Sequence, residues 1–68
     1  MELEDWRQDL QLQLEELDSG KLDSPISVPV GHPPNQVELD EAAEIIDEAG
    51  RVVLDLKGDQ SWLIAEVI

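Results

Sequence analysis

Carboxylates are the side chains through which this sequence could do chemistry. Asp and Glu number 17 against four Lys and Arg, so the formal net charge is −13. In the window VELDEAAEIIDEA (37–49) six acids occur without a base: Glu38, Asp40, Glu41, Glu44, Asp47 and Glu48. Acids of this density could bind calcium, act as the general acid and base of a hydrolase, or contact a basic partner.

The catalytic interpretation lacks supporting residues. His32 is the single histidine and lies in the rigid segment GHPPN, so we interpret it as a surface or turn residue. The sequence has no cysteine and no glycine-rich phosphate loop, and a chain of 68 residues has little room for a cleft that excludes water. We therefore expect no enzymatic activity and no cofactor.

One segment has the length and the two ends of a calcium-binding loop. DLKGDQSWLIAE (55–66) begins with Asp and has Glu at its twelfth position. An EF-hand loop also needs an oxygen ligand at its third position and glycine at its sixth, where this segment has Lys57 and Gln60. We predict a β-hairpin here and no metal site.

Two segments have the apolar spacing of amphipathic helices. The first covers about residues 3–18 and ends before Gly20. The second covers about residues 36–49, where Asn35 and Glu38 have the spacing of a capping box, and Gly50 ends it. The apolar stripe of the first helix consists of Leu3, Trp6, Leu10, Leu14 and Leu17, so we predict that Trp6 packs in the core.

The remaining apolar segments predict a small sheet. Residues 26–30 alternate in polarity but contain Pro29, which cannot donate to a ladder, so they form an edge strand. Residues 51–68 contain two β-prone runs around the loop GDQ and predict a C-terminal β-hairpin. The prediction is a single α+β domain, residues 1–68, with the order α-β-α-β-β, a short three-stranded sheet and two amphipathic helices.

The last predicted strand is mostly apolar on both faces, with Trp62, Ile64 and Ile68 on one and Leu63, Ala65 and Val67 on the other. Such a strand is normally covered on both sides, so either the two helices sandwich the sheet or one face is buried against another chain. Trp62 opens this strand, and tryptophan is a favoured interface residue. We therefore count Trp62 as a candidate partner contact. Because small chains without disulfides often depend on association, a homo-oligomer also stays open.

Local stability does not account for the acids of the second helix. Asp40 with Glu44, and Glu44 with Glu48, are like-charge i,i+4 pairs that each cost about 0.2–0.5 kcal/mol. Asp47 and Glu48 also lie at the unfavourable end of the helix dipole. We predict that the six acids of the window form a contact surface for a basic protein. The acids of the first helix could do so instead: Glu2, Glu4, Asp5, Asp9, Glu15, Glu16 and Asp18.

The charge spacing is comparable with that of a nucleic acid. The helix rises about 15 Å between Glu38 and Glu48, which gives about one charge per 3 Å. One strand of B-DNA carries a phosphate about every 3.4 Å. In size and charge the chain is similar to small DNA-mimic inhibitors of phages and plasmids, including some anti-restriction and anti-CRISPR proteins, although it matches no family motif. That similarity implies an inhibitor that docks its anionic face on a basic, nucleic-acid-handling protein.

Two alternatives to an inhibitor stay open. The chain could be an antitoxin or a small regulatory or assembly subunit that binds through its apolar surface. Alternatively, the acids only keep a small domain soluble, as in a halophilic cytoplasm. Direct nucleic-acid binding is not expected, because the four basic residues are scattered. The acidic start and short apolar runs predict a cytoplasmic protein without a signal peptide or membrane contact.

Overall fold

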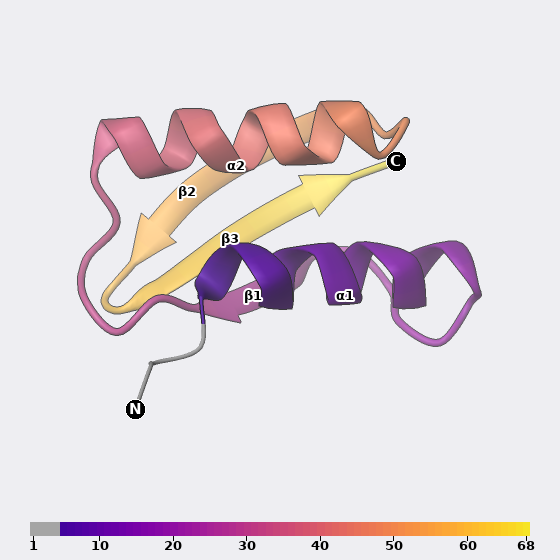
Figure 1. Ribbon diagram of the computed structural model, residues 1–68, viewed down its shortest axis with the longest axis horizontal. Helices are drawn as coiled ribbons and strands as arrows, with labels where there is room; N and C mark the ends of the chain where they lie inside the picture. The colour runs from indigo at the N-terminus through magenta and orange to yellow at the C-terminus, as the bar shows by residue number, and fades with distance from the viewer. Residues whose placement is uncertain (1–4) are drawn as a thin grey trace.

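Two helices and three strands follow one another in the order α-β-α-β-β (Figure 1). The computed structural model describes residues 5–68. Its elements are α1 (Trp6–Asp18), β1 (Ile26–Pro29), α2 (Gln36–Glu48), β2 (Val53–Asp59) and β3 (Trp62–Val67). The predicted α+β class and element order are confirmed, whereas the predicted helical positions 3 and 4 lie outside the described residues.

Strand β3 is the centre of the sheet. The strand order is β1-β3-β2, and both neighbours run antiparallel to β3. Strand β1 is an edge strand, as the proline in it predicts. Val28 of β1 and Gly58 of β2 both lie opposite Leu63, so these three positions share one face of the sheet.

Both helices cover this same face. Helix α1 packs on β1, α2 packs on β2, and the two helices contact each other. Along β3, burial alternates, with Leu63, Ala65 and Val67 buried and Trp62 and Glu66 exposed. The alternative in which the helices sandwich the sheet is therefore wrong, because the far face of the sheet carries no helix in residues 5–68. The buried core consists of Trp6, Leu10, Leu14, Ile26, Val28, Ala42, Ile46, Leu63, Ala65 and Val67.

The helix ends follow the local signals in the sequence. Helix α1 begins where the carboxylate of Asp5 accepts a hydrogen bond from the Arg7 amide at 3.0 Å. It ends at Asp18, and Gly20 just beyond it has a φ of 84°, which lets the Lys21 amide donate back to the Glu16 carbonyl at 2.8 Å. Helix α2 ends in the same way at Gly50. Neither helix is long and apolar enough to cross a membrane, within the part of the chain that the structure describes.

The hairpin differs from the prediction at its turn. The sequence predicts the loop at GDQ (58–60), but Gly58 and Asp59 continue β2, and Gln60 and Ser61 form the turn. Gln60 takes the positive φ, 56°, that a tight hairpin turn requires. Gly58 has a different reason to be glycine. A Cβ built on it would lie 2.8 Å from Cγ of Pro34, in the connector that crosses β2.

The two helices run in the same direction across the sheet (Figure 1). Consistent with this, Arg7 near the start of α1 reaches Glu41 of α2, and Asp18 at the end of α1 reaches Arg51 just beyond α2. Both carboxyl-terminal helix ends therefore lie at one end of the molecule. The negative ends of two helix dipoles meet there.

Candidate functional site

The six predicted acids of α2 do not form a single face. Glu41 and Glu48 lie toward α1, where Glu41 binds Arg7 and Glu48 borders a groove between the helices. Asp40, Glu44 and Asp47 are exposed and follow the i, i+4, i+7 spacing of one outer stripe. The acids are thus divided between an interhelical side and an outer side.

Glu38 is engaged inside the protein. Its carboxylate accepts a hydrogen bond from the Asn35 amide at 3.1 Å and lies 2.7 Å from Nε2 of His32. The backbone hydrogen bond from Asn35, followed by the contact with His32, holds the pKa of Glu38 below its ordinary value. Only 13 % of the side chain is exposed. The Glu38 carboxylate therefore caps the helix, and little of it is accessible to a partner.

Glu41 is also engaged, in a contact that the sequence did not predict. The Arg7 guanidinium donates to both Glu41 oxygens, with Nη2–Oε1 at 2.5 Å and Nε–Oε2 at 3.2 Å. It also binds Asp5 at 3.0 Å and lies 4.6 Å from the centre of the Trp6 ring. The two carboxylates, Glu41 above all, raise the pKa of Arg7. Because Arg7 and Glu41 lie 34 positions apart, no local pattern in the sequence marks this pair.

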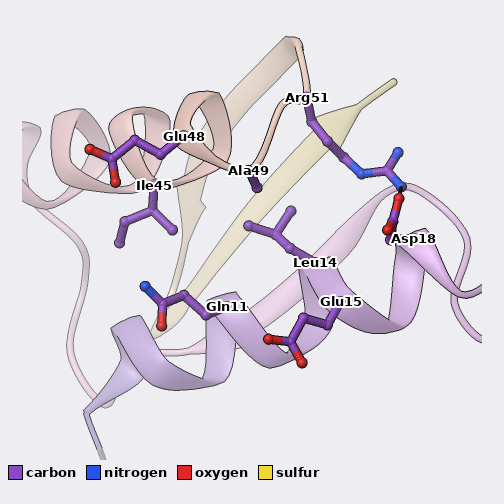
Figure 2. Close-up of a pocket in the computed structure, with 8 residues that line it drawn as sticks. All are labelled: Gln11, Leu14, Glu15, Asp18, Ile45, Glu48, Ala49 and Arg51. Carbon is purple, nitrogen blue, oxygen red and sulfur yellow. Dashed lines mark hydrogen bonds and ion pairs between the residues drawn. The ribbon is translucent and has the colours of Figure 1, made fainter.

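An open groove lies between the carboxyl-terminal halves of the helices (Figure 2). Its volume is about 330 Å³. It is lined by Gln11, Leu14, Glu15 and Asp18 from α1 and by Ile45, Glu48, Ala49 and Arg51 from α2 and the residues that follow. Leu14 and Ile45 point into the space between the helices and give the groove an apolar floor, while Glu15 and Glu48 stand on opposite sides.

The rim of the groove is predominantly negative. Arg51 is the one cation among its lining residues, and it reaches Asp18 at 3.4 Å while keeping only 21 % of its side chain exposed. Glu15 and Glu48 make no ion pair with a base in residues 5–68. Neither helix has a basic residue in its last turn, so among the lining residues only Arg51, just beyond α2, brings positive charge to the negative dipole ends.

An apolar floor with a carboxylate rim fits a long cationic side chain. Lysine and arginine pack their methylene stems on apolar surface and leave their charged ends at the edge. Here the stem would lie on Leu14 and Ile45, and the charged end would meet Glu15 or Glu48. Charge-assisted hydrogen bonds of that kind are the stronger ones. The sequence pattern, taken one helix at a time, does not predict this combination.

Trp62 lies apart from all of these acids. It belongs to the exposed positions of β3, on the face of the sheet opposite the helices, and 45 % of it is accessible. The structure therefore does not join Trp62 and the α2 acids in one surface. Together they define two candidate surfaces, one on the helices and one on the bare side of the sheet.

Neither a metal site nor a relative helps to assign these surfaces. Within residues 5–68, no three His, Asp or Glu side chains gather closely enough to hold a metal ion. Comparison of the chain with protein-family models, curated proteins and solved structures finds no match. A function must consequently be inferred from the shape and charge of the two surfaces.

Proposed function

We propose that this protein is a non-catalytic binding protein of the cytoplasm that docks its helical layer on a basic protein. The observation that supports the proposal best is the interhelical groove, with its apolar floor and its two carboxylates free of an ion pair among residues 5–68. The contact surface combines Glu15 of α1 with Glu44, Asp47 and Glu48 of α2. Glu38 and Glu41 stay outside it, because both are bound within the chain.

The physical reason is that these acids are unfavourable in the free protein. They repel one another, and the acids in the last turns also face the negative helix ends. A cationic partner surface would remove both penalties on binding. Part of the binding free energy would therefore come from removing repulsion that is already present in the unbound protein. If the acids serve only solubility, this repulsion is never removed.

A nucleic-acid-handling protein is the partner class that fits this surface. Such proteins carry clustered Lys and Arg that follow a phosphate backbone, and the exposed acids of the helical layer offer negative charge to the same residues. Docking there would occupy the channel and exclude the nucleic acid. The proposed activity is inhibition by occupancy, of the DNA-mimic kind, with no chemical step.

The test compares two variants that each lose two negative charges, one variant on the helical layer and the other on the opposite face of the sheet. Glu15→Gln with Glu48→Gln neutralises the groove, and Asp55→Asn with Glu66→Gln neutralises the same number of acids on the bare sheet face. Tagged protein captures partners from host lysate at about 0.05 M NaCl and is then washed at about 1 M, where the screening length falls to about 3 Å. We expect a nucleic-acid-binding protein that is released by salt, binds the groove variant at least tenfold more weakly, and binds the sheet-face variant normally.

The captured protein is then purified and given labelled duplex DNA or RNA. We expect the wild-type chain to displace the nucleic acid and the groove variant to fail. A partner that survives the high-salt wash and ignores the groove variant would favour the antitoxin or assembly-subunit alternative. Capture of nothing at low salt would mean that the acids serve solubility alone. Either result refutes the proposal.

A further inference from the structure

The face of the sheet away from the helices is bare in the described chain, and it has a definite composition. We call it the open face. Cross-strand partners share a face, so the exposed positions of β3 and their neighbours define it. Its members are Pro29 and Ser27 on β1, Trp62, Ile64 and Glu66 on β3, Asp55, Lys57 and Asp59 on β2, and the terminal pair Val52 and Ile68.

Apolar groups form a strip along the centre of the open face. Trp62 is 45 % exposed, and Ile68, just beyond β3, is 65 % exposed; Ile64 and Glu66 lie between them in the same row. Val52 extends the strip, since it exchanges two backbone hydrogen bonds with Ile68, at 3.2 and 3.0 Å. Tryptophan is enriched among the residues that contribute most to binding at protein interfaces.

Carboxylates lie beside and within this strip in an arrangement that is unfavourable in the free protein, with Asp55 and Asp59 on β2 and Glu66 in the row of β3. Asp55 lies directly opposite Glu66, and Asp59 lies directly opposite Trp62. Directly opposed residues hold their Cβ atoms about 4.5–5.5 Å apart, and like charges at that distance destabilise the strand pair. Lys57 is the one base of the open face and lies opposite Ile64. The open face therefore carries a net negative charge, with three carboxylates against one ammonium group.

This charge pattern argues against a second copy of the chain as the occupant. Each open face carries three carboxylates and one ammonium group. Two stacked copies would bring six carboxylates against two ammonium groups, between molecules that each have a net charge of −13. Like-charge juxtaposition of this kind suppresses association. A partner with cations at its rim would instead complement Asp55, Glu66 and Asp59.

We propose that the open face is a second binding surface, which takes a protein segment whose apolar residues are flanked by Lys or Arg. The apolar residues would cover Trp62, Ile64 and Ile68, and the cations would meet the Asp55–Glu66 pair and Asp59. The surface lies on the opposite side of the sheet from the interhelical groove. Binding here does not depend on the function proposed for the helical layer.

Three synthetic peptides of equal length provide the probes. The first alternates Val and Arg, the second alternates Ser and Arg with the same charge, and the third alternates Val and Glu. Each is titrated into isotopically labelled protein while backbone amide signals and the two indole signals are followed by NMR. We expect the Val–Arg peptide to shift Trp62, Ile64 and Glu66 and to bind at least tenfold more tightly than the Ser–Arg peptide. The Val–Glu peptide should not bind.

Variants then locate the contact. Trp62→Ala and Ile68→Ser should each weaken Val–Arg binding at least tenfold. Val37→Ser is the matched control, since Val37 is 67 % exposed but lies on α2. The groove variant Glu15→Gln with Glu48→Gln should leave the shifts of β3 unchanged, so that failure of the helical-layer function and failure of this proposal can be told apart. Ile68 is 65 % exposed, which makes its variant safe for folding even if Trp62→Ala unfolds the chain.

Three results would overturn the proposal. The first is a Val–Arg peptide that shifts only helical residues, which would show general attraction to an acidic protein. The second is equal binding of the Val–Arg and Ser–Arg peptides. The third is sedimentation of the chain alone as a dimer that Trp62→Ala dissociates, which would make a second copy the occupant.

Discussion

The Glu38 side chain has two uses that compete for the same carboxylate. As an acid of the 37–49 window it is a predicted partner contact, and as the third residue of α2 it is a predicted member of a capping box. The capping box is present, and His32 occupies the remaining oxygen. The spacing from Asn35 to Glu38 is local and could be predicted from the sequence. The contact with His32 depends on how the connector 31–34 folds back, which no spacing rule gives.

Replacing Glu38 by a neutral residue should remove a pH-dependent contribution to the free energy of unfolding. Because the pKa of Glu38 is lowered in the folded protein, its charge stabilises the fold above the ordinary glutamate range, and that contribution is lost as pH falls through the lowered pKa. Glu38→Gln should therefore have a smaller free energy of unfolding than the wild type at pH 7. The gap should narrow as pH falls below the ordinary glutamate range and the carboxylate becomes protonated in the folded protein as well. Urea titrations followed by tryptophan fluorescence at several pH values measure the difference in the free energy of unfolding.

Glu44→Gln is the control for this experiment, since Glu44 is exposed on the outer stripe and makes no cap. It removes the same charge as Glu38→Gln, and it also removes the repulsion of Glu44 with Asp40 and with Glu48. Its free energy of unfolding at pH 7 should therefore equal or exceed that of the wild type. A gap between Glu38→Gln and the wild type that has the same size at every pH would mean that the charge of Glu38 contributes nothing and that the cap works through hydrogen bonding alone.

At the scale of elements, local signals predict the helix ends, and packing over long separations decides the rest. Gly20 and Gly50 end their helices as expected, because the left-handed conformation of a helix end is a property of one residue. The hairpin glycine has no such local signature. A turn role is the natural prediction for Gly58, yet glycine is needed there because Pro34 crosses β2, and that crossing joins positions far apart in the chain. Local sequence patterns likewise do not predict that both helices pack on the same face of the sheet.

Gly58→Ala tests this close approach. The added methyl would lie 2.8 Å from Cγ and 3.0 Å from Cδ of Pro34, so the connector or β2 must shift. We expect a loss of about 1–3 kcal/mol in the free energy of unfolding, as for other overpacked sites. Without the clash, replacing glycine by alanine in a strand would raise the free energy of unfolding by about 0.5–1 kcal/mol.

Pro34→Ala supplies the second arm of a double-mutant cycle. Removing the ring should make Gly58→Ala much less costly, with a coupling above about 0.5 kcal/mol. Urea unfolding of the four proteins gives the coupling directly. Equal stability of Gly58→Ala and the wild type would contradict the packing argument and return Gly58 to a turn-related role.

The molecule as a whole separates its two surfaces by the thickness of a sheet and a helical layer. The helical layer presents free carboxylates around the interhelical groove, and the open face presents an apolar strip between acids. The sequence contains both signals, in the acidic window and in a last strand that is mostly apolar on both faces. It does not reveal that they belong to opposite faces, because Trp62 and Glu48 are placed by the sheet register and by the helix orientation.

Added salt should stabilise the whole protein. The described chain measures 30 × 26 × 19 Å, so most of its charges lie within a few screening lengths of one another at about 0.1 M salt, where that length is about 10 Å. With 17 acids against four bases, repulsion outweighs the attraction within the Arg7–Glu41 and Arg51–Asp18 pairs. The free energy of unfolding in urea should therefore rise from about 0.05 to about 0.5 M NaCl, over which the screening length shortens.

The matched comparison is the variant that combines Glu15→Gln and Glu48→Gln. It removes two of the charges that crowd the carboxyl-terminal helix ends, so it should be more stable than the wild type at low salt and respond less to NaCl. Asp55→Asn with Glu66→Gln should behave similarly if the opposed pair on β2 and β3 also repels. Salt that acted only by strengthening apolar burial would raise all three proteins equally. That outcome would contradict the repulsion among the acids on which both proposed binding surfaces depend.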